Sequence, residues 1–224
     1  AHSLERYKSL IEFGQITNSS MGIKSIKKKA RNQIKKLLEC EKVNIFTKVE
    51  REDFVTCQKH GEEITYPIDA KSFVGSSAHY LAVLHIKDVG SDIRLAREHG
   101  SVRDMELKDM LLIPVVSSGE VLGVVQVINS LNYEFNKEDI HFAEALALQM
   151  ASVLENYLLY QKLHRQFLQV VEAMVDAIGK KDAYTGGHTK RVCHFAQMIG
   201  KELNLNHQEM SELKLAGVLH DIGK

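Results

Sequence analysis

Residues 111–128, LLIPVVSSGEVLGVVQVI, contain two apolar runs joined by a short polar turn. The runs at 111–116 and 121–128 are rich in β-branched side chains, and the Ser-Ser-Gly at 117–119 has the composition of a tight turn. This pattern predicts a β-hairpin. Because no charged residue interrupts either run, we expect the hairpin to lie at the centre of a sheet.

Four shorter β-rich runs precede the hairpin and are separated by charged residues. They occupy residues 43–46, 54–57, 63–67 and 83–86. The first three predict an antiparallel meander. Residues 72–80 favour a short helix, and the polar stretch 87–108 favours a long loop, which in a compact domain usually has a function.

Two amphipathic helices are expected before these strands, at 4–19 and 23–39. The order of two helices, several strands, an embedded helix and loop, a hairpin and a final helix predicts an α+β fold. In that fold we expect an antiparallel sheet with its helices on one face.

Charge and composition exclude several classes of protein. The chain has 29 Lys plus Arg and 29 Asp plus Glu, so no net field favours DNA or an anionic membrane. The basic run from Lys24 to Lys36 alternates with apolar residues, which fits a solvated helix face or a local partner surface. Three cysteines without metal or redox spacing, and no apolar run of about 20 residues, favour a cytoplasmic protein without membrane attachment.

A long helix follows the hairpin. Residues 137–178 contain no Gly or Pro, and Asn136 is a good N-cap. Asp139 suits the positive end of the helix dipole, and Phe135 with Ile140 have the spacing of a hydrophobic staple. These residues predict a continuous helix that starts at a well-defined position.

Apolar and aromatic residues, with one histidine, recur every three or four positions along this helix. They are Ala143, Leu146, Met150, Val153, Tyr157, Tyr160, His164, Phe167, Val171, Met174 and Ile178. A heptad pattern of this kind predicts a coiled coil and a homodimer through the long helix. Alternatively, the first half packs on the sheet and the second half belongs to the next domain.

The final residues contain three side chains that suit a metal site. His188 follows a Gly-Gly pair, and His220 and Asp221 are adjacent. Imidazole and carboxylate groups bind iron, manganese or zinc, and a carboxylate can bridge two ions. A His-Asp pair alone is a weak indication, but the combination with the Gly-Gly-His segment is specific.

The segment from about 170 to 224 resembles the start of an HD-GYP domain, an HD phosphohydrolase that hydrolyses cyclic di-GMP. The motifs are KDAYTGGHTKRV at 181–192 and HDIGK at 220–224. The resemblance implies that His188, His220 and Asp221 ligate divalent metal. It also implies that Asp221 and Lys224 belong to the catalytic site, with Lys224 near the scissile phosphate.

The resemblance covers only part of that family's motif set. The later histidines, the closing aspartate and the Gly-Tyr-Pro motif do not occur before the last residue, Lys224. Three ligands cannot hold two octahedral ions, so we expect a truncated HD domain that is inactive as this chain alone. His194 and His207 occupy no family ligand position, and we expect surface or core roles for them.

Residues 1–155 resemble a GAF domain, a sensor of small ligands. The motifs are YPIDAKSFVG at 66–75, LIPV at 112–115 and VLGVVQVIN at 121–129. The resemblance implies an unidentified small ligand, for which we predict contacts from Phe73, Asp88, Asp92 and Asn129. Only part of the cyclic-nucleotide signature is present, since Ser130 and Ile140 replace its Lys and Glu.

The predicted organisation is therefore a GAF domain at 1–155, a connecting helix at 137–178 and an HD segment at 170–224. We interpret the chain as the sensory region of a cyclic di-GMP phosphodiesterase. The alternatives are a standalone GAF binding or dimerisation module with a non-catalytic HD remnant, and an HD hydrolase acting on other nucleotides. Further ligand motifs in the parent gene would separate the phosphodiesterase interpretation from the standalone GAF module.

Overall fold

The computed structural model describes residues 22–49, 52–59, 62–97, 102, 105–132, 134–179 and 185–220. The helix predicted at 4–19 lies outside these residues. The chain divides into two compact units, Ala1–Leu158 and Leu159–Lys224, which are described separately below.

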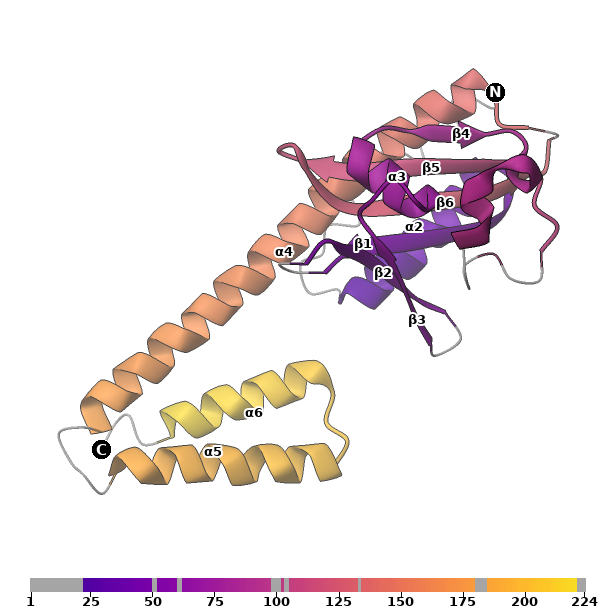
Figure 1. The fold of residues 1–224 in the computed structure, drawn as a ribbon. Coiled ribbons are helices and arrows are strands. Elements are labelled where there is room, and N and C mark those ends of the chain that lie inside the picture. The colour runs from indigo at the N-terminus through magenta and orange to yellow at the C-terminus, as the bar shows by residue number, and fades with distance from the viewer. Residues whose placement is uncertain are drawn as a thin grey trace. The chain divides into compact units, whose positions relative to one another are not determined.

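The first unit contains a six-stranded antiparallel sheet with the strand order β3-β2-β1-β6-β5-β4 (Figure 1). The strands are β1 (Cys40–Lys48), β2 (Phe54–Lys59), β3 (Glu62–Pro67), β4 (Leu84–Ile86), β5 (Met110–Ser117) and β6 (Glu120–Ser130). The predicted β5–β6 hairpin is confirmed, with Ile113 opposite Val125. Strands β1 and β6 form the middle of the sheet, and the predicted β1–β2–β3 meander is also present.

Each face of the sheet packs against helices. Helix α2 (Ile23–Leu37) and the first part of α4 (Lys137–Gly179) cover one face. Helix α3 (Phe73–Tyr80) and the 3-10 helices η1 (Val89–Ser91) and η2 (Ile93–Arg97) cover the other face (Figure 1).

The expectation of helices on one face only was wrong. Neighbouring residues of β6 point to opposite faces, and both sides of the strand are apolar. Val125 joins the core beneath α2 and α4, whereas Val124 joins the core beneath α3. A strand that is buried on both sides requires a cover on both sides, and part of the predicted 87–108 loop supplies it through η1 and η2.

Helix α4 is continuous over 43 residues, as predicted. Its N-cap is confirmed, because Asn136 Oδ1 accepts from the Asp139 amide and Asp139 Oδ2 accepts from the Asn136 amide, each at 3.0 Å. This reciprocal pair satisfies two backbone donors at the helix start.

The first half of the predicted heptad seam is not available to a second chain. Ala143, Leu146, Met150 and Val153 are buried, the first three in the core formed with α2 and the sheet. For this half the interpretation as packing on the sheet is correct. Over three turns a heptad seam and an ordinary amphipathic stripe place apolar residues at the same positions, so the sequence did not separate them.

The second unit contains the end of α4, α5 (Thr185–Glu202) and α6 (His207–Leu219). Helix α6 begins with a capping box between Asn206 and Glu209. Helices α5 and α6 pack closely where Gly217 lies against Cys193, since a Cβ atom at position 217 would be 3.0 Å from the Cys193 Sγ. The short connection at 203–206 and this close approach make the two helices a hairpin.

Candidate functional site

The helical hairpin brings two of the predicted metal ligands together. His188 lies in the first turn of α5, and His220 is the C-cap residue of α6. Their ring centroids are 5.5 Å apart and the rings are tilted by 60°. Residues that are far apart in sequence therefore present two imidazoles at one end of the hairpin.

A backbone contact fixes the tautomer of His220. Its Nδ1 lies 2.7 Å from the carbonyl oxygen of Gly217. A carbonyl oxygen only accepts hydrogen bonds, so Nδ1 carries the proton and the ring lone pair is on Nε2. Metal-binding histidines are commonly oriented by such a contact to the nitrogen that does not bind the metal.

The remaining predicted residues of this site, Asp221 and Lys224, lie outside the described residues. Within the described part of the chain, no group of three or more His, Cys, Asp or Glu side chains is placed to hold a metal ion. Two imidazoles can supply two ligands of a divalent metal site, and a third ligand would be needed to complete it. His194 is exposed on α5, as expected for a residue outside the site.

A polar contact within the second unit joins α4 to α6, and its partner Ser211 was not predicted. His164 Nε2 lies 3.0 Å from the Ser211 Oγ, and the His164 ring stacks parallel to Tyr160 at 6.5 Å between centroids. The long helix is thus hydrogen-bonded to the helix that ends at His220. Only the heptad position of His164 suggested that it faces another helix.

Phe73 and Asp92 of the predicted sensory pocket are connected by an arginine. The Arg94 guanidinium lies 5.0 Å from the Phe73 ring centroid and forms a two-pronged ion pair with Asp92, with its shorter contact at 2.6 Å. The hydrogen bonds from Arg94 hold the pKa of the Asp92 carboxyl below its ordinary value. Phe73 is fully buried, so the ion pair caps the α3 side of the core.

The other predicted pocket residues are Asn129, near the end of β6, and Asp88, in the segment before β5. Asp88 is exposed and precedes η1. Asn129 is buried, has a φ of 55°, and its side chain bonds the Lys108 amide, the Glu106 carbonyl and the Glu41 carboxylate. Its contacts hold the segment before β5 against the end of β6. The ligand contacts predicted for these four residues stay a prediction.

A buried carboxylate, Asp109, holds the start of α4 and was missed in the sequence. It is 1% exposed, and its two oxygens accept from the amides of Ser130 and Phe135 at 2.8 and 2.9 Å. Its backbone carbonyl also accepts from the Asn129 amide. Asp109 therefore connects β5, β6 and the residue before the α4 N-cap.

Two domain families match the sequence. The GAF domain matches residues 25–154, more than half of the chain, and the HD domain matches residues 185–224. The chain belongs to the GAF-domain family. The HD-domain match lies within the second unit.

Two curated relatives from Vibrio cholerae are similar to part of this chain, and both are named as phosphodiesterases. The 3′3′-cGAMP-specific phosphodiesterase 1 is 24% identical over 159 residues, which are 68% of this chain and 34% of that protein. The 3′3′-cGAMP-specific phosphodiesterase 3 is 38% identical over 58 residues, which are 24% of this chain and 13% of that protein. The chain thus spans about a third or less of each relative.

Solved structures agree on the fold of the first unit. The GAF domain of a Coxiella burnetii phosphoenolpyruvate-protein phosphotransferase has a TM-score of 0.55 at 15% identity, over 69% of this chain and 95% of that one. The corresponding Acinetobacter domain has a TM-score of 0.54 at 17% identity, over 67% and 93%. Among the described residues, no helix has the length and apolar character to cross a membrane.

Proposed function

We propose that this chain is the sensory and regulatory region of a metal-dependent phosphodiesterase that hydrolyses a cyclic dinucleotide, with cyclic di-GMP as the expected substrate. The observation that carries the proposal is the approach of the His188 and His220 rings to 5.5 Å at the end of the α5–α6 hairpin. The HD-domain match and the names of the two Vibrio relatives support it.

The proposed site uses His188, His220 and Asp221 to hold iron, manganese or zinc. A divalent metal ion, when bound, supplies a Lewis acid for phosphoryl transfer. The Gly217 carbonyl keeps the His220 ring in one tautomer and orientation. Lys224 follows the ligands in sequence, and its cation would offset negative charge that develops on the phosphoryl oxygens.

We propose that the GAF domain, at 1–155, controls the HD segment, at 170–224, through the connecting helix at 137–178. A ligand regulates the enzyme only if it binds two arrangements of the protein with different affinity. Asp109 holds the start of α4 against the sheet, and His164 binds α6 near its centre. These contacts give the helix one anchor in each unit.

We propose that the homodimer forms through the second half of α4, on a stripe that shares only Phe167 with the predicted heptad seam, because His164 of that seam contacts α6. Leu159, Leu163, Phe167 and Val170 are 52–64% exposed and recur at helical spacing. Four exposed apolar side chains in one stripe are typical of a helix that pairs with another helix. A second copy of the chain, with the same stripe, is the proposed occupant.

We propose that the chain by itself does not turn over substrate, since His188, His220 and Asp221 cannot complete a two-metal centre. The localisation proposed is cytoplasmic, because the three cysteines in the sequence have neither metal-ligand nor redox spacing. No DNA or membrane partner is proposed.

The test is hydrolysis of cyclic di-GMP and of 3′3′-cGAMP, followed by chromatography of the linear products. It compares this chain with the product of the complete reading frame that contains it. The proposal predicts turnover of a cyclic dinucleotide by the longer protein only. Turnover by neither protein would favour the standalone GAF module, and turnover of other nucleotides alone would favour the broader class of HD hydrolase.

A further inference from the structure

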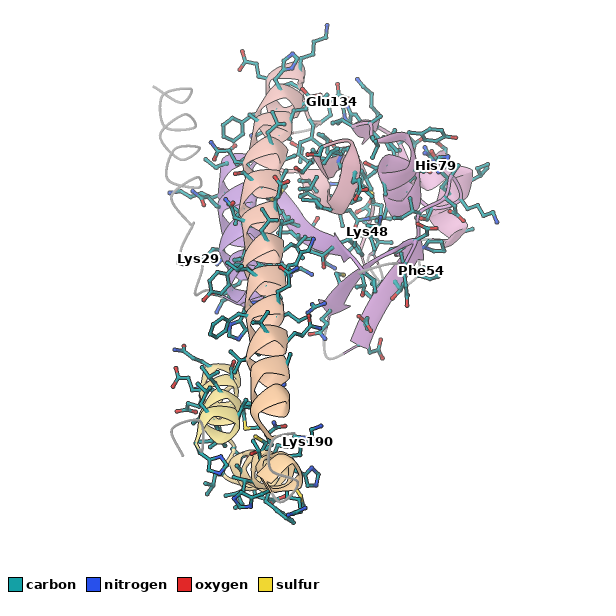
Figure 2. All side chains as sticks on the ribbon, turned by 90° about the vertical axis from the view of Figure 1, so that its left-hand side faces the viewer. Lys29, Lys48, Phe54, His79, Glu134 and Lys190 are labelled. Atoms are coloured by element: carbon teal, nitrogen blue, oxygen red, sulfur yellow. The ribbon has the colours of Figure 1, made fainter. Side chains whose placement is uncertain are left out.

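A concave site lies on the face of the sheet opposite α3. It is a pocket with a volume of ≈ 510 Å³ between helix α2 and strands β1, β2 and β3. This volume falls in the range of about 300–1,000 Å³ that is usual for sites of small molecules. The predicted sensory residues Phe73 and Asp92 belong to the α3 side. Figure 2 shows α2, with Lys29, and α3, with His79, on opposite sides of the sheet.

The pocket forms because the sheet surface changes from apolar to polar beyond β1. Under α2, Ile45 is buried in the core with the helix residues Ala30 and Ile34. Next along the sheet, Thr47 pairs with Thr56, so the two side chains share one face. Thr56 and Gln58 of β2 also line the pocket, so this part of its floor is polar.

The wall that α2 contributes is strongly basic. Lys24, Lys27, Lys28 and Arg31 line the pocket, and Glu63 is the carboxylate among its lining residues. The Glu63 carboxylate accepts a hydrogen bond from the Thr56 hydroxyl at 2.9 Å. Among the described lining residues, four cations therefore face one carboxylate, which leaves an excess of positive charge.

Two of these cations, Lys27 and Arg31, are partly buried. Lys27 donates to the Thr47 hydroxyl at 2.8 Å, and burial together with the charge of Arg31 holds the pKa of its ammonium below the ordinary value. The Arg31 Nε is buried and has no hydrogen-bond partner among the described residues. An unpartnered buried donor is unfavourable unless a ligand or solvent accepts from it.

We propose that this pocket binds a phosphorylated small molecule of nucleotide size through Lys24, Lys27, Lys28 and Arg31. Phosphate oxygens accept from both ammonium and guanidinium groups, and an arginine offers paired donors to them. Thr47 and Thr56 supply hydroxyl groups on the floor for a polar ligand. The site is independent of the proposed metal centre, and it lies on the other face of the sheet from the predicted GAF pocket.

The test is titration calorimetry of the 224-residue chain with inorganic pyrophosphate and with GMP at low ionic strength. Methionine replaces the cations in Lys27→Met/Arg31→Met, so that most of the aliphatic stem is kept. The matched control is Lys29→Met/Lys36→Met, which removes the same charge from exposed positions of α2 outside the pocket. We expect at least about a tenfold loss of affinity in the first pair and less than about a twofold loss in the control.

A gain-of-affinity variant separates binding from folding defects. Glu63→Gln removes the carboxylate of the pocket, and we expect it to strengthen pyrophosphate binding by about two- to fivefold. Binding of GMP alone would assign the site to nucleotides, and binding of both probes would assign it to phosphate groups more generally. Absence of saturable binding of either probe, or equal losses in the two double variants, would overturn the proposal.

Discussion

The imidazole Nε2 of His164 on α4 lies 3.0 Å from the hydroxyl oxygen of Ser211 on α6. This contact joins the long helix to the helix that ends at His220. A change in the position of α4 within this unit would therefore act on the helix that carries a proposed metal ligand. Stacking of Tyr160 on His164 restricts the imidazole further.

Ser211→Ala removes this hydrogen bond, and alanine also favours the helical conformation at this position. We expect a loss of about 1 kcal/mol in the stability of the α4–α6 contact, because the bond is partly buried. Hydrogen-exchange protection of the α6 amides measures the loss. In a double-mutant cycle with His164→Ala the two effects should be non-additive, and full additivity would show that the pair is not coupled.

Asp109→Ala should be severely destabilising. It leaves the amides of Ser130 and Phe135 without their acceptor, and the Phe135 amide is buried. We expect a loss of about 2–4 kcal/mol in the free energy of unfolding, measured by denaturant titration. Asp88→Ala, at an exposed position, is the control and should change stability by less than about 0.5 kcal/mol. Equal effects of the two substitutions on the free energy of unfolding would contradict the structural role of Asp109.

Two charged substitutions on α4 separate packing from dimerisation. Met150 is 2% exposed in the core, so Met150→Glu should unfold the first unit by burying a charge. Leu163 is 64% exposed, so Leu163→Glu should leave the circular dichroism spectrum unchanged and convert a dimer to a monomer. Light scattering reports the mass. A Leu163→Glu protein that stays dimeric would contradict the assignment of the dimer to this stripe.

Ionisation of the Cys40 thiol should lower the free energy of unfolding at high pH. Burial raises the pKa of its thiol to about 12, above its ordinary value of 9.0. Because the folded-state pKa is the higher one, this contribution to stability is complete below pH 9 and is lost as the pH rises toward 12.

The check compares unfolding of the natural chain and Cys40→Ala across this window. The natural chain should lose about 1.4 kcal/mol more for each pH unit. Identical pH dependence of the two proteins would show that the thiol is not held in its neutral form.

Local pattern was sufficient for most elements of the first unit. The β-branched runs, the turn at 117–119 and the Asn136 N-cap each specify their structure from neighbouring residues, and the structure has all of them. The placement of helices on both faces depends on which side chains of β6 are buried. Its two sides are equally apolar, so the pattern did not show that α3 and the 3-10 helices cover one of them.

In the candidate sites, too, residues within a sequence motif could be predicted, whereas residues whose partners are distant in sequence could not. The Gly-Gly-His and His-Asp motifs predicted the pairing of His188 with His220, which the hairpin brings about. Asp109 and Ser211 are single polar residues without a motif, and their partners come from distant parts of the chain. The basic residues of α2 looked like a solvated face, because the polar surface opposite them comes from strands that pair in three dimensions.

Metal content tests the central claim most directly. The complete gene product is purified as the natural protein, as His188→Ala and as His194→Ala, and its iron, manganese and zinc are measured by mass spectrometry. His194 is exposed on the same helix and serves as the matched control. The account predicts bound metal in the natural protein and in His194→Ala, and much less bound metal in His188→Ala, because loss of a ligand weakens metal affinity by at least about tenfold. Equal metal content in all three proteins, or none in the natural protein, would contradict it.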